Sequence, residues 1–276
     1  MKIITDTSAL YSLQDGKELG IEVIPACVLV DGVAYRDYED ISSEEFLELI
    51  EQGKVPTSSQ PAIGDVIDIF EGTQEDILYL TIGDGLSGTY QNAMGARNCV
   101  EQNEHIRIID TQTLAGSQRY LVQKAMMLKK EGVGIEEIVK QVNNSVVNSV
   151  SFVIPSDFNY LKRSGRLTPI AAAICSVIKI IPVLTQTEDM RRIKPFAIKR
   201  SFKKAVDAVI EYFKGMRVNQ DYIISIGHAC VRQMAEEVVK QIRNHFSDTT
   251  IELFQLSPTL ITHGGPGCIT IQAIYR

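Results

Sequence analysis

Three short segments of the chain carry side chains that could bind an anion. The first is the glycine turn Gly83–Thr89, in which Ser87 and Thr89 offer hydroxyl donors while Gly85 and Gly88 allow the backbone to approach a ligand closely. It separates an apolar segment of strand length from a predicted helix, and the free N–H groups at a helix N-terminus attract anions. Taken alone, the segment could also be an ordinary turn with a serine N-cap.

A second segment, Pro56–Pro61, contains three consecutive hydroxyl residues between two prolines, namely Thr57, Ser58 and Ser59. We expect a rigid loop there, because both prolines restrict the backbone. Three hydroxyls in a row could present donors to a carboxylate or a phosphate. The alternative is a turn with polar residues of no special function.

The third segment, His263–Cys268, places glycines on both sides of Pro266, just before the last predicted strand. We expect a tight loop whose backbone can touch a ligand, with His263 at its mouth. His228 follows another predicted strand, and whether it faces the same cleft stays open. No two histidines have the spacing of metal ligands and no Ser–His–Asp order can be singled out, so we predict neither a metal site nor a catalytic triad.

The composition excludes several classes of protein. The chain has 276 residues, 45% of them hydrophobic and 22% charged, and this length favours two domains. A net charge of -6 argues against nucleic acid as a partner. We expect a cytoplasmic protein without a signal peptide or membrane span, because no run of about 18 apolar residues occurs and the N-terminus begins with a strand pattern. Five scattered cysteines without a CxxC motif are typical of a reducing compartment.

Residues 1–150 alternate predicted strands and helices, which is typical of an α/β domain with a parallel sheet between two helix layers. In such sheets ligands bind beyond the carboxyl ends of the strands, and both Gly83–Thr89 and the hydroxyl cluster Asp6–Ser8 follow such ends. Asp6–Ser8 could equally cap a helix. A capping box at Ser42 and Glu45 predicts one helix start. The predicted strands are Met1–Asp6, Glu22–Val30, Asp76–Ile82 and Ile106–Asp110.

Residues 151–276 carry successive strands without an intervening helix, for example Ile180–Thr185 and Arg192–Ile198. This pattern predicts a second domain of the α+β class with a mixed sheet. The most apolar predicted helix, Ile170–Val177, is apolar on all sides and should therefore be buried or line a cavity. Core packing is the default interpretation, and a ligand tunnel beside its small side chains is the alternative.

Taken together, these segments resemble the DegV family of bacterial fatty acid-binding proteins, and the similarity covers essentially the whole chain. Seven motifs, in order and at family-like spacing, carry the resemblance. They are Thr5-Asp6-Thr7-Ser8, Thr57-Ser58-Ser59-Gln60-Pro61, Leu86-Ser87-Gly88-Thr89-Tyr90-Gln91, Tyr160-Leu161-Lys162-Arg163-Ser164-Gly165-Arg166-Leu167, Ile193-Lys194-Pro195, His228-Ala229 and His263-Gly264-Gly265-Pro266-Gly267.

The resemblance implies a two-domain DegV-like fold that holds one long-chain fatty acid between its domains, with the acyl chain in an apolar tunnel. By position in the family's motifs, Ser58, Ser87 and His263 would hold the carboxylate. Ser58 stands where threonine is usual and keeps the hydroxyl. The neighbours Thr57, Gly88 and Thr89 are assigned to the same site, and Ile170, Ala173, Ile174 and Val177 are assigned to the tunnel. No cofactor is implied besides the bound fatty acid.

Family members of this kind present the bound acid to a separate ATP-dependent fatty acid kinase, which makes acyl-phosphate for phospholipid synthesis. The present chain has no Walker loop or kinase glycine motif, so phosphorylation would be the partner's reaction and the chain itself no enzyme. An excess of bases between Lys162 and Lys204 is a candidate docking surface or simply a solvated basic face. Within it, Arg163, Arg166 and Arg200 are assigned to docking.

Two other functions stay open at this point. An acyl- or phosphoryl-transfer enzyme could use Ser87 as nucleophile and His263 as base, although no carboxylate is identifiable as the third member. A sensor of a small anion could use the same hydroxyls. The long apolar segment Ile170–Ile181 argues against the sensor, because a small anion needs no tunnel.

Overall fold

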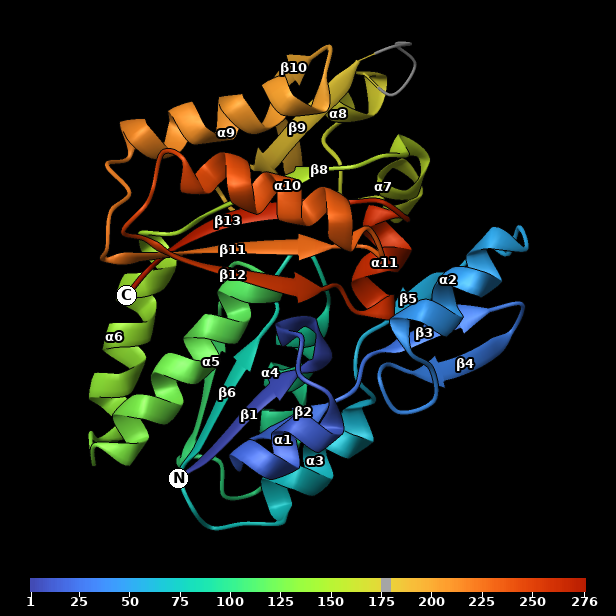
Figure 1. The fold of residues 1–276 in the computed structure, drawn as a ribbon. Coiled ribbons are helices and arrows are strands. Elements are labelled where there is room, and N and C mark those ends of the chain that lie inside the picture. Colours follow the sequence, from blue (N-terminus) through green and yellow to red (C-terminus); the bar gives the residue numbers. More distant parts are fainter. Residues whose placement is uncertain (175–179) are drawn as a thin grey trace.

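Four strands of the N-terminal half form a parallel sheet in the order β2-β1-β6-β7 (Figure 1). The structure is a computed structural model, and it describes residues 1–174 and 180–276. Helices cover both faces of this sheet, as its strongly apolar strands require, because parallel strands are buried on both sides. The strands are β1 (Lys2–Asp6), β2 (Glu22–Ile24), β6 (Ile77–Thr81) and β7 (Ile106–Asp110).

Two separate apolar cores hold the helix layers to the parallel sheet. On one face, Val66 and Phe70 of one helix and Ala93 of another pack against Ile4 and Tyr79. On the other face, Leu121 and Val142 belong to the core formed with Ile3 and Leu80. The helices are α3 (Ile63–Glu71) and α4 (Thr89–Cys99) on the first face, and α5 (Ala115–Lys130) and α6 (Ile135–Val147) on the second. The short helix α1 (Leu13–Leu19) precedes β2.

The C-terminal half contains a six-stranded sheet in the order β10-β9-β8-β13-β11-β12. This sheet is mixed, since β11 and β12 run parallel whereas the other described pairs are antiparallel. Two amphipathic helices, α9 (Phe202–Gly215) and α10 (Arg232–Arg243), cover one of its faces. The strands are β8 (Val150–Ile154), β9 (Ile181–Gln186), β10 (Ile193–Lys199), β11 (Tyr222–His228), β12 (Thr250–Gln255) and β13 (Ile269–Tyr275).

Helix α5 lies between the two large sheets and packs against both (Figure 1). Its close approach to β11 requires a glycine, because a Cβ at Gly116 would lie 1.6 Å from Ser225 Oγ. The α/β class with a parallel sheet and a separate mixed sheet is therefore as predicted. The division into two domains at residue 150 stays a prediction.

A third, small antiparallel sheet has the order β4-β3-β5, and the prediction from the sequence missed part of it. Glu22–Val30, predicted as one strand, is two strands in different sheets, because Pro25 interrupts it and offers no N–H to a ladder. Thr57–Ser59, predicted as a loop, is strand β5 and pairs with β3. The predicted capping box is confirmed at the start of α2 (Ser43–Glu51). The sheet consists of β3 (Cys27–Val30), β4 (Val33–Arg36) and β5 (Thr57–Ser59).

Three short helices complete the part of the chain that bears on the site: α7 (Phe158–Ser164), α8 (Pro169–Ile174) and α11 (Pro258–Gly264). Helix α11 was not predicted, although the sequence contains the signals for a helix start. Ser257 caps it through Leu260 N, and Pro258 occupies its first turn. None of the described helices combines the length and apolar character of a membrane-crossing segment.

Candidate functional site

The centre of the site is a contact between the second and third predicted segments. Ser58 Oγ lies 2.7 Å from His263 Nε2, although 205 residues separate the two in sequence. Pairing of Ser58 with Val28 turns the Ser58 side chain inward, while Thr57 and Ser59 on either side are exposed. Alternation along a strand thus selects Ser58 and corrects the assignment of Thr57, which faces solvent.

The sequence predicted that His263 lies at the mouth of a loop. In the structure it belongs to the last turn of α11 instead. The tight turn begins after it, at Gly265, which has a φ of +79° and so adopts the left-handed region that favours glycine. Burial of the imidazole, and secondarily the nearby charge of Arg166, lower the pKa of His263 to about 4. At neutral pH the ring is therefore uncharged, and it can donate one hydrogen bond and accept another.

The glycine turn Gly83–Thr89 lies beside the segment that carries Ser58. Ser87 Oγ and Thr89 Oγ1 are 2.9 Å apart, and Thr89 N donates to Ser87 Oγ at 3.3 Å. A Cβ at Gly88 would lie 2.2 Å from the side-chain oxygen of Gln60, so the glycine turn and the end of β5 touch. The two hydroxyl-bearing segments thus lie side by side, which fits the common site that the family resemblance implied for them.

Arg166 also belongs to the site. Its Nε donates to the carbonyl of Leu86 at 3.0 Å, and it lines the same cavity as His263. Arg166 is half-buried, and its assignment to a docking surface stays a prediction. Arg163 and Arg200 are exposed, and the guanidinium of Arg163 lies 4.5 Å from the ring centroid of Tyr160. Their role in docking stays a prediction.

An apolar cavity of about 100 Å³ opens beside His263 and Arg166. A second cavity of about 50 Å³ adjoins it, and both share the lining residues Leu86, Leu114, Val153, Ile193 and Thr270. The cavities lie between segments of both halves of the chain. Carbon atoms dominate their walls, which suits an acyl chain better than a polar ligand.

Of the predicted tunnel residues, the two whose side chains the structure describes, Ile170 and Ala173, do not line these cavities. Ile170 is 72% exposed and Ala173 is exposed too, whereas Ala171 is the buried residue of α8. Apolar composition suggested burial on all sides, but among the described side chains of α8 Ala171 is buried while Ile170 is exposed. The side chain of Ile174 and the whole of Val177 lie outside what the structure describes.

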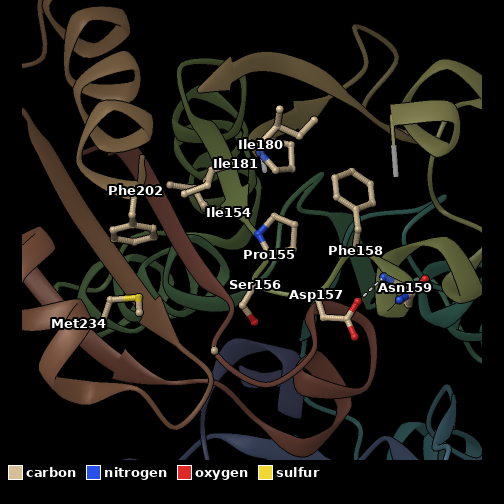
Figure 2. A pocket seen from close by; sticks show the side chains of 12 residues that line it. Ile154, Pro155, Ser156, Asp157, Phe158, Asn159, Ile180, Ile181, Phe202 and Met234 are labelled. Atoms are coloured by element: carbon tan, nitrogen blue, oxygen red, sulfur yellow. Dashed lines mark hydrogen bonds between the residues drawn. The ribbon is translucent and has the colours of Figure 1, made fainter. Parts of the chain in front are cut away.

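The largest described cavity, about 480 Å³, is a separate space. Ile154 lines it, while the neighbouring Val153 lines the apolar cavities, so it lies at the other face of β8. Figure 2 shows Phe158, Phe202 and Met234 around it. None of the predicted carboxylate-binding residues lines this cavity.

Two other motifs have structural roles. Asp6 is buried, and its carboxylate accepts from Ser8 N and from Ile82 N, both at 2.9 Å, so it caps the turn after β1 and ties it to the end of β6. The capping alternative holds for Asp6, which caps the short 3-10 helix Thr7–Ala9, whereas Ser12 caps the following helix α1. His228 is buried, burial lowers its pKa, and it lines neither apolar cavity.

Metal binding finds no support in the described residues, since no group of three or more His, Cys, Asp or Glu side chains there could hold an ion. The arrangement offers instead a hydroxyl, a neutral imidazole and a guanidinium at the mouth of an apolar cavity. Such a set can hold the carboxylate of an amphipathic acid.

Comparison with known proteins shows the family to which the chain belongs. The family model described as "Uncharacterised protein, DegV family" matches residues 1–276. The DegV domain-containing protein SA1258 of Staphylococcus aureus is 30% identical, over 99% of this chain and 98% of its own length. The crystal structure of the fatty acid-binding DegV family protein SAG1342 from Streptococcus agalactiae superimposes with a TM-score of 0.90 at 24% identity, covering 100% of this chain and 98% of its own. DegV of Bacillus subtilis, also described as a fatty acid-binding protein, gives 0.87 at 23% identity, covering 100% and 99%. The chain is a member of the DegV family.

Proposed function

We propose that the chain binds one long-chain fatty acid, with the carboxylate at Ser58 and His263 and the acyl chain in the adjoining apolar cavities. The observation that carries the proposal is the 2.7 Å contact between Ser58 Oγ and His263 Nε2 at the mouth of an apolar cavity. Solved structures of similar fold are described as fatty acid-binding proteins. This supports the ligand class.

The polar groups at the cavity mouth suit a carboxylate. Ser58 and the neutral ring of His263 carry one polar hydrogen each; their mutual hydrogen bond uses one of the two, and the other can be donated to a carboxylate. Hydrogen bonds to an ionised acceptor are about twice as strong as neutral ones. Arg166 supplies a nearby positive charge, which reduces the cost of bringing the anion out of water. Ser87 and Thr89 add further hydroxyls on the adjoining turn.

Burial of the acyl chain would supply most of the affinity. About 15 methylenes at roughly 0.8 kcal/mol each contribute on the order of 10 kcal/mol before the costs of association. The cavities of about 100 and 50 Å³ are smaller than the roughly 300 Å³ at the lower end of ligand pockets. Binding therefore widens the space between the two halves.

The chain presents its bound acid to a separate ATP-dependent kinase in the cytoplasm, and it carries out no chemistry itself. Arg163 and Arg200 are exposed and could contact that partner. This part of the proposal rests on the resemblance of the motifs to family members that act in this way.

Native mass spectrometry of the freshly purified protein, followed by extraction and lipid identification, tests the proposal. We expect a mass increment of one fatty acid. Ser58→Ala, Ser87→Ala and His263→Ala should each retain less lipid, while Ser247→Ala, an exposed serine outside the site, should retain as much as the wild type. A protein that stays ligand-free after incubation with several fatty acids would contradict the proposal.

The contact between Ser58 and His263 also raises acyl transfer as a second candidate, because nucleophile and base pair at this distance in hydrolases. A pKa of about 4 makes His263 a weak base at neutral pH. Ser87, the predicted nucleophile, contacts Thr89 instead. Turnover of activated acyl esters by the protein alone would favour this candidate, and no turnover would remove it.

A further inference from the structure

Polar side chains stand among the apolar walls at one end of the two adjoining cavities. The second cavity is lined by Ser151, Gln186 and Gln272 in addition to its apolar walls. Because side chains alternate along a strand, Thr270 and Gln272 share one face of β13, and Cys268 precedes them on the same side. Cys268 lines the cavity beside His263, so the walls run along β13 from His263 to Gln272. Four residues of strand span about 13 Å.

Cross-strand pairs of β8 and β13 show where polar side chains enter the lining of the cavities. Val153 of β8 lies opposite Thr270 of β13, and one step further along the same face Ser151 lies opposite Gln272. The first pair lines both cavities, whereas the second pair lines only the smaller one. An acyl chain that enters at His263 therefore meets apolar walls first and an amide last.

Gln272 is fixed in place by its hydrogen bonds. Its side chain is 1% exposed, and its oxygen accepts from Ser117 N at 3.1 Å. Its nitrogen donates to Ser151 Oγ at 2.8 Å, to Leu114 O at 3.0 Å and to Thr113 Oγ1 at 3.3 Å. Displacing this amide would leave several buried polar groups unsatisfied, each at a cost comparable to a lost hydrogen bond.

Gln186 closes the same end from β9. Its side-chain nitrogen donates to Gln112 O at 2.7 Å and to Met190 O at 3.2 Å. Both amides bond across to the segment 112–117 of the other half of the chain, so the polar end wall is also a joint between the halves. A methyl end that arrives here meets two side-chain amides whose nitrogens are already hydrogen-bonded.

We infer that Gln272, together with Gln186, forms the end wall of the acyl site and sets the longest chain that the protein accommodates. This inference rests on the proposed fatty acid-binding function. Gln272→Ala removes the wall and opens space beyond it, so chains that exceed the limit gain buried methylenes. The loss of hydrogen bonds in this variant should change the affinities for short and long acids equally. The ratio of the two affinities therefore reports only the steric effect of the end wall.

Competition binding of saturated fatty acids of increasing length to the full chain tests this role. Two acids are compared: the longest that wild type binds tightly, and one that is two carbons longer. We expect Gln272→Ala to raise the ratio of the affinity for the longer acid to that for the shorter acid about tenfold, since two further methylenes are buried. Gln118→Ala is the matched control, because Gln118 is also a fully buried, hydrogen-bonded glutamine but lines neither cavity. Its length preference should match wild type.

An unchanged length preference in a folded Gln272→Ala variant that still binds fatty acid would overturn the inference and leave the proposed function intact. If Gln272→Ala does not fold, Gln186→Ala, which loses fewer hydrogen bonds, takes its place and should shift the preference in the same direction. No shift there would overturn the inference equally. A wild-type protein that binds no fatty acid would instead refute the proposed function.

Discussion

Asp84 forms an ion pair with Arg191 that joins the two halves of the chain, with 2.8 Å between Asp84 Oδ2 and Arg191 Nη1. The carboxylate side chain is 9% exposed and also accepts from Gln91 Nε2 at 3.1 Å. Close by, a Cβ at Gly85 would lie 2.7 Å from the backbone of Arg191, so the glycine turn and the β9–β10 connection are in direct contact. The pair lies at the turn that carries Ser87.

Arg191→Ala should loosen this contact and speed the release of a bound acid. We expect a loss of roughly 1 kcal/mol in unfolding free energy, because the pair is half exposed on the arginine side. Urea unfolding and ligand-release kinetics measure the two effects. Glu188→Gln is the control, since Glu188 is almost fully exposed and its pair with Lys194 spans 3.5 Å. Equal release rates for wild type and Arg191→Ala would contradict the prediction.

A buried carboxylate at the start of α11 should make stability depend on pH. Asp37 is fully buried, and burial raises its pKa to about 7. The hydroxyls of Thr259, Thr7 and Ser257 lie near and offset part of this effect, yet no described group bonds either carboxylate oxygen with good geometry. The folded protein therefore holds the proton more tightly than the unfolded chain, whose aspartate titrates near 3.8.

The stabilisation that comes from protonated Asp37 is complete below pH 4 and is lost as the pH rises to about 7. Asp37→Asn cannot ionise, so it should unfold with a flatter pH dependence and be more stable than wild type at pH 8, on the order of 2 kcal/mol. Urea unfolding at pH 5 and pH 8 measures both proteins. A pH dependence in Asp37→Asn as steep as that of wild type would assign the effect to other groups.

The packing of α5 on the mixed sheet should tolerate no side chain at Gly116. Gly116→Ala would place a Cβ 1.6 Å from Ser225 Oγ and 2.5 Å from Ser225 Cβ, and overpacking of this kind costs about 1–3 kcal/mol. Thermal unfolding should show the loss, and Ser225→Gly in the same chain should restore most of it. Gly95→Ala within α4 is the control, because the nearest atom is 3.8 Å away and an alanine there should stabilise the helix by about 0.5–1 kcal/mol. Equal stabilities of Gly116→Ala and wild type would contradict the close approach.

Local patterns in the sequence were enough to predict the fold class and the segments of the candidate site. Alternating strands and helices, apolar strands buried on both faces and the capping box at Ser42 all act over a few residues, so local patterns predict them. The glycine turn with Ser87 and the hydroxyl run with Ser58 were found for the same reason. Helix α11 could have been found too, since Ser257 and Pro258 are a local start signal.

Which of these residues lie together depends on contacts between distant parts of the chain. Ser58, and not Thr57, meets His263, because the pairing of β5 with β3 sets which side chains point inward. Arg166, between α7 and α8, points inward and bonds to Leu86 O. Ile170 of α8 points to solvent, because of the way this helix packs against the rest of the chain. Contacts between residues hundreds of positions apart depend on the register and packing of whole elements, which no local pattern of residues encodes.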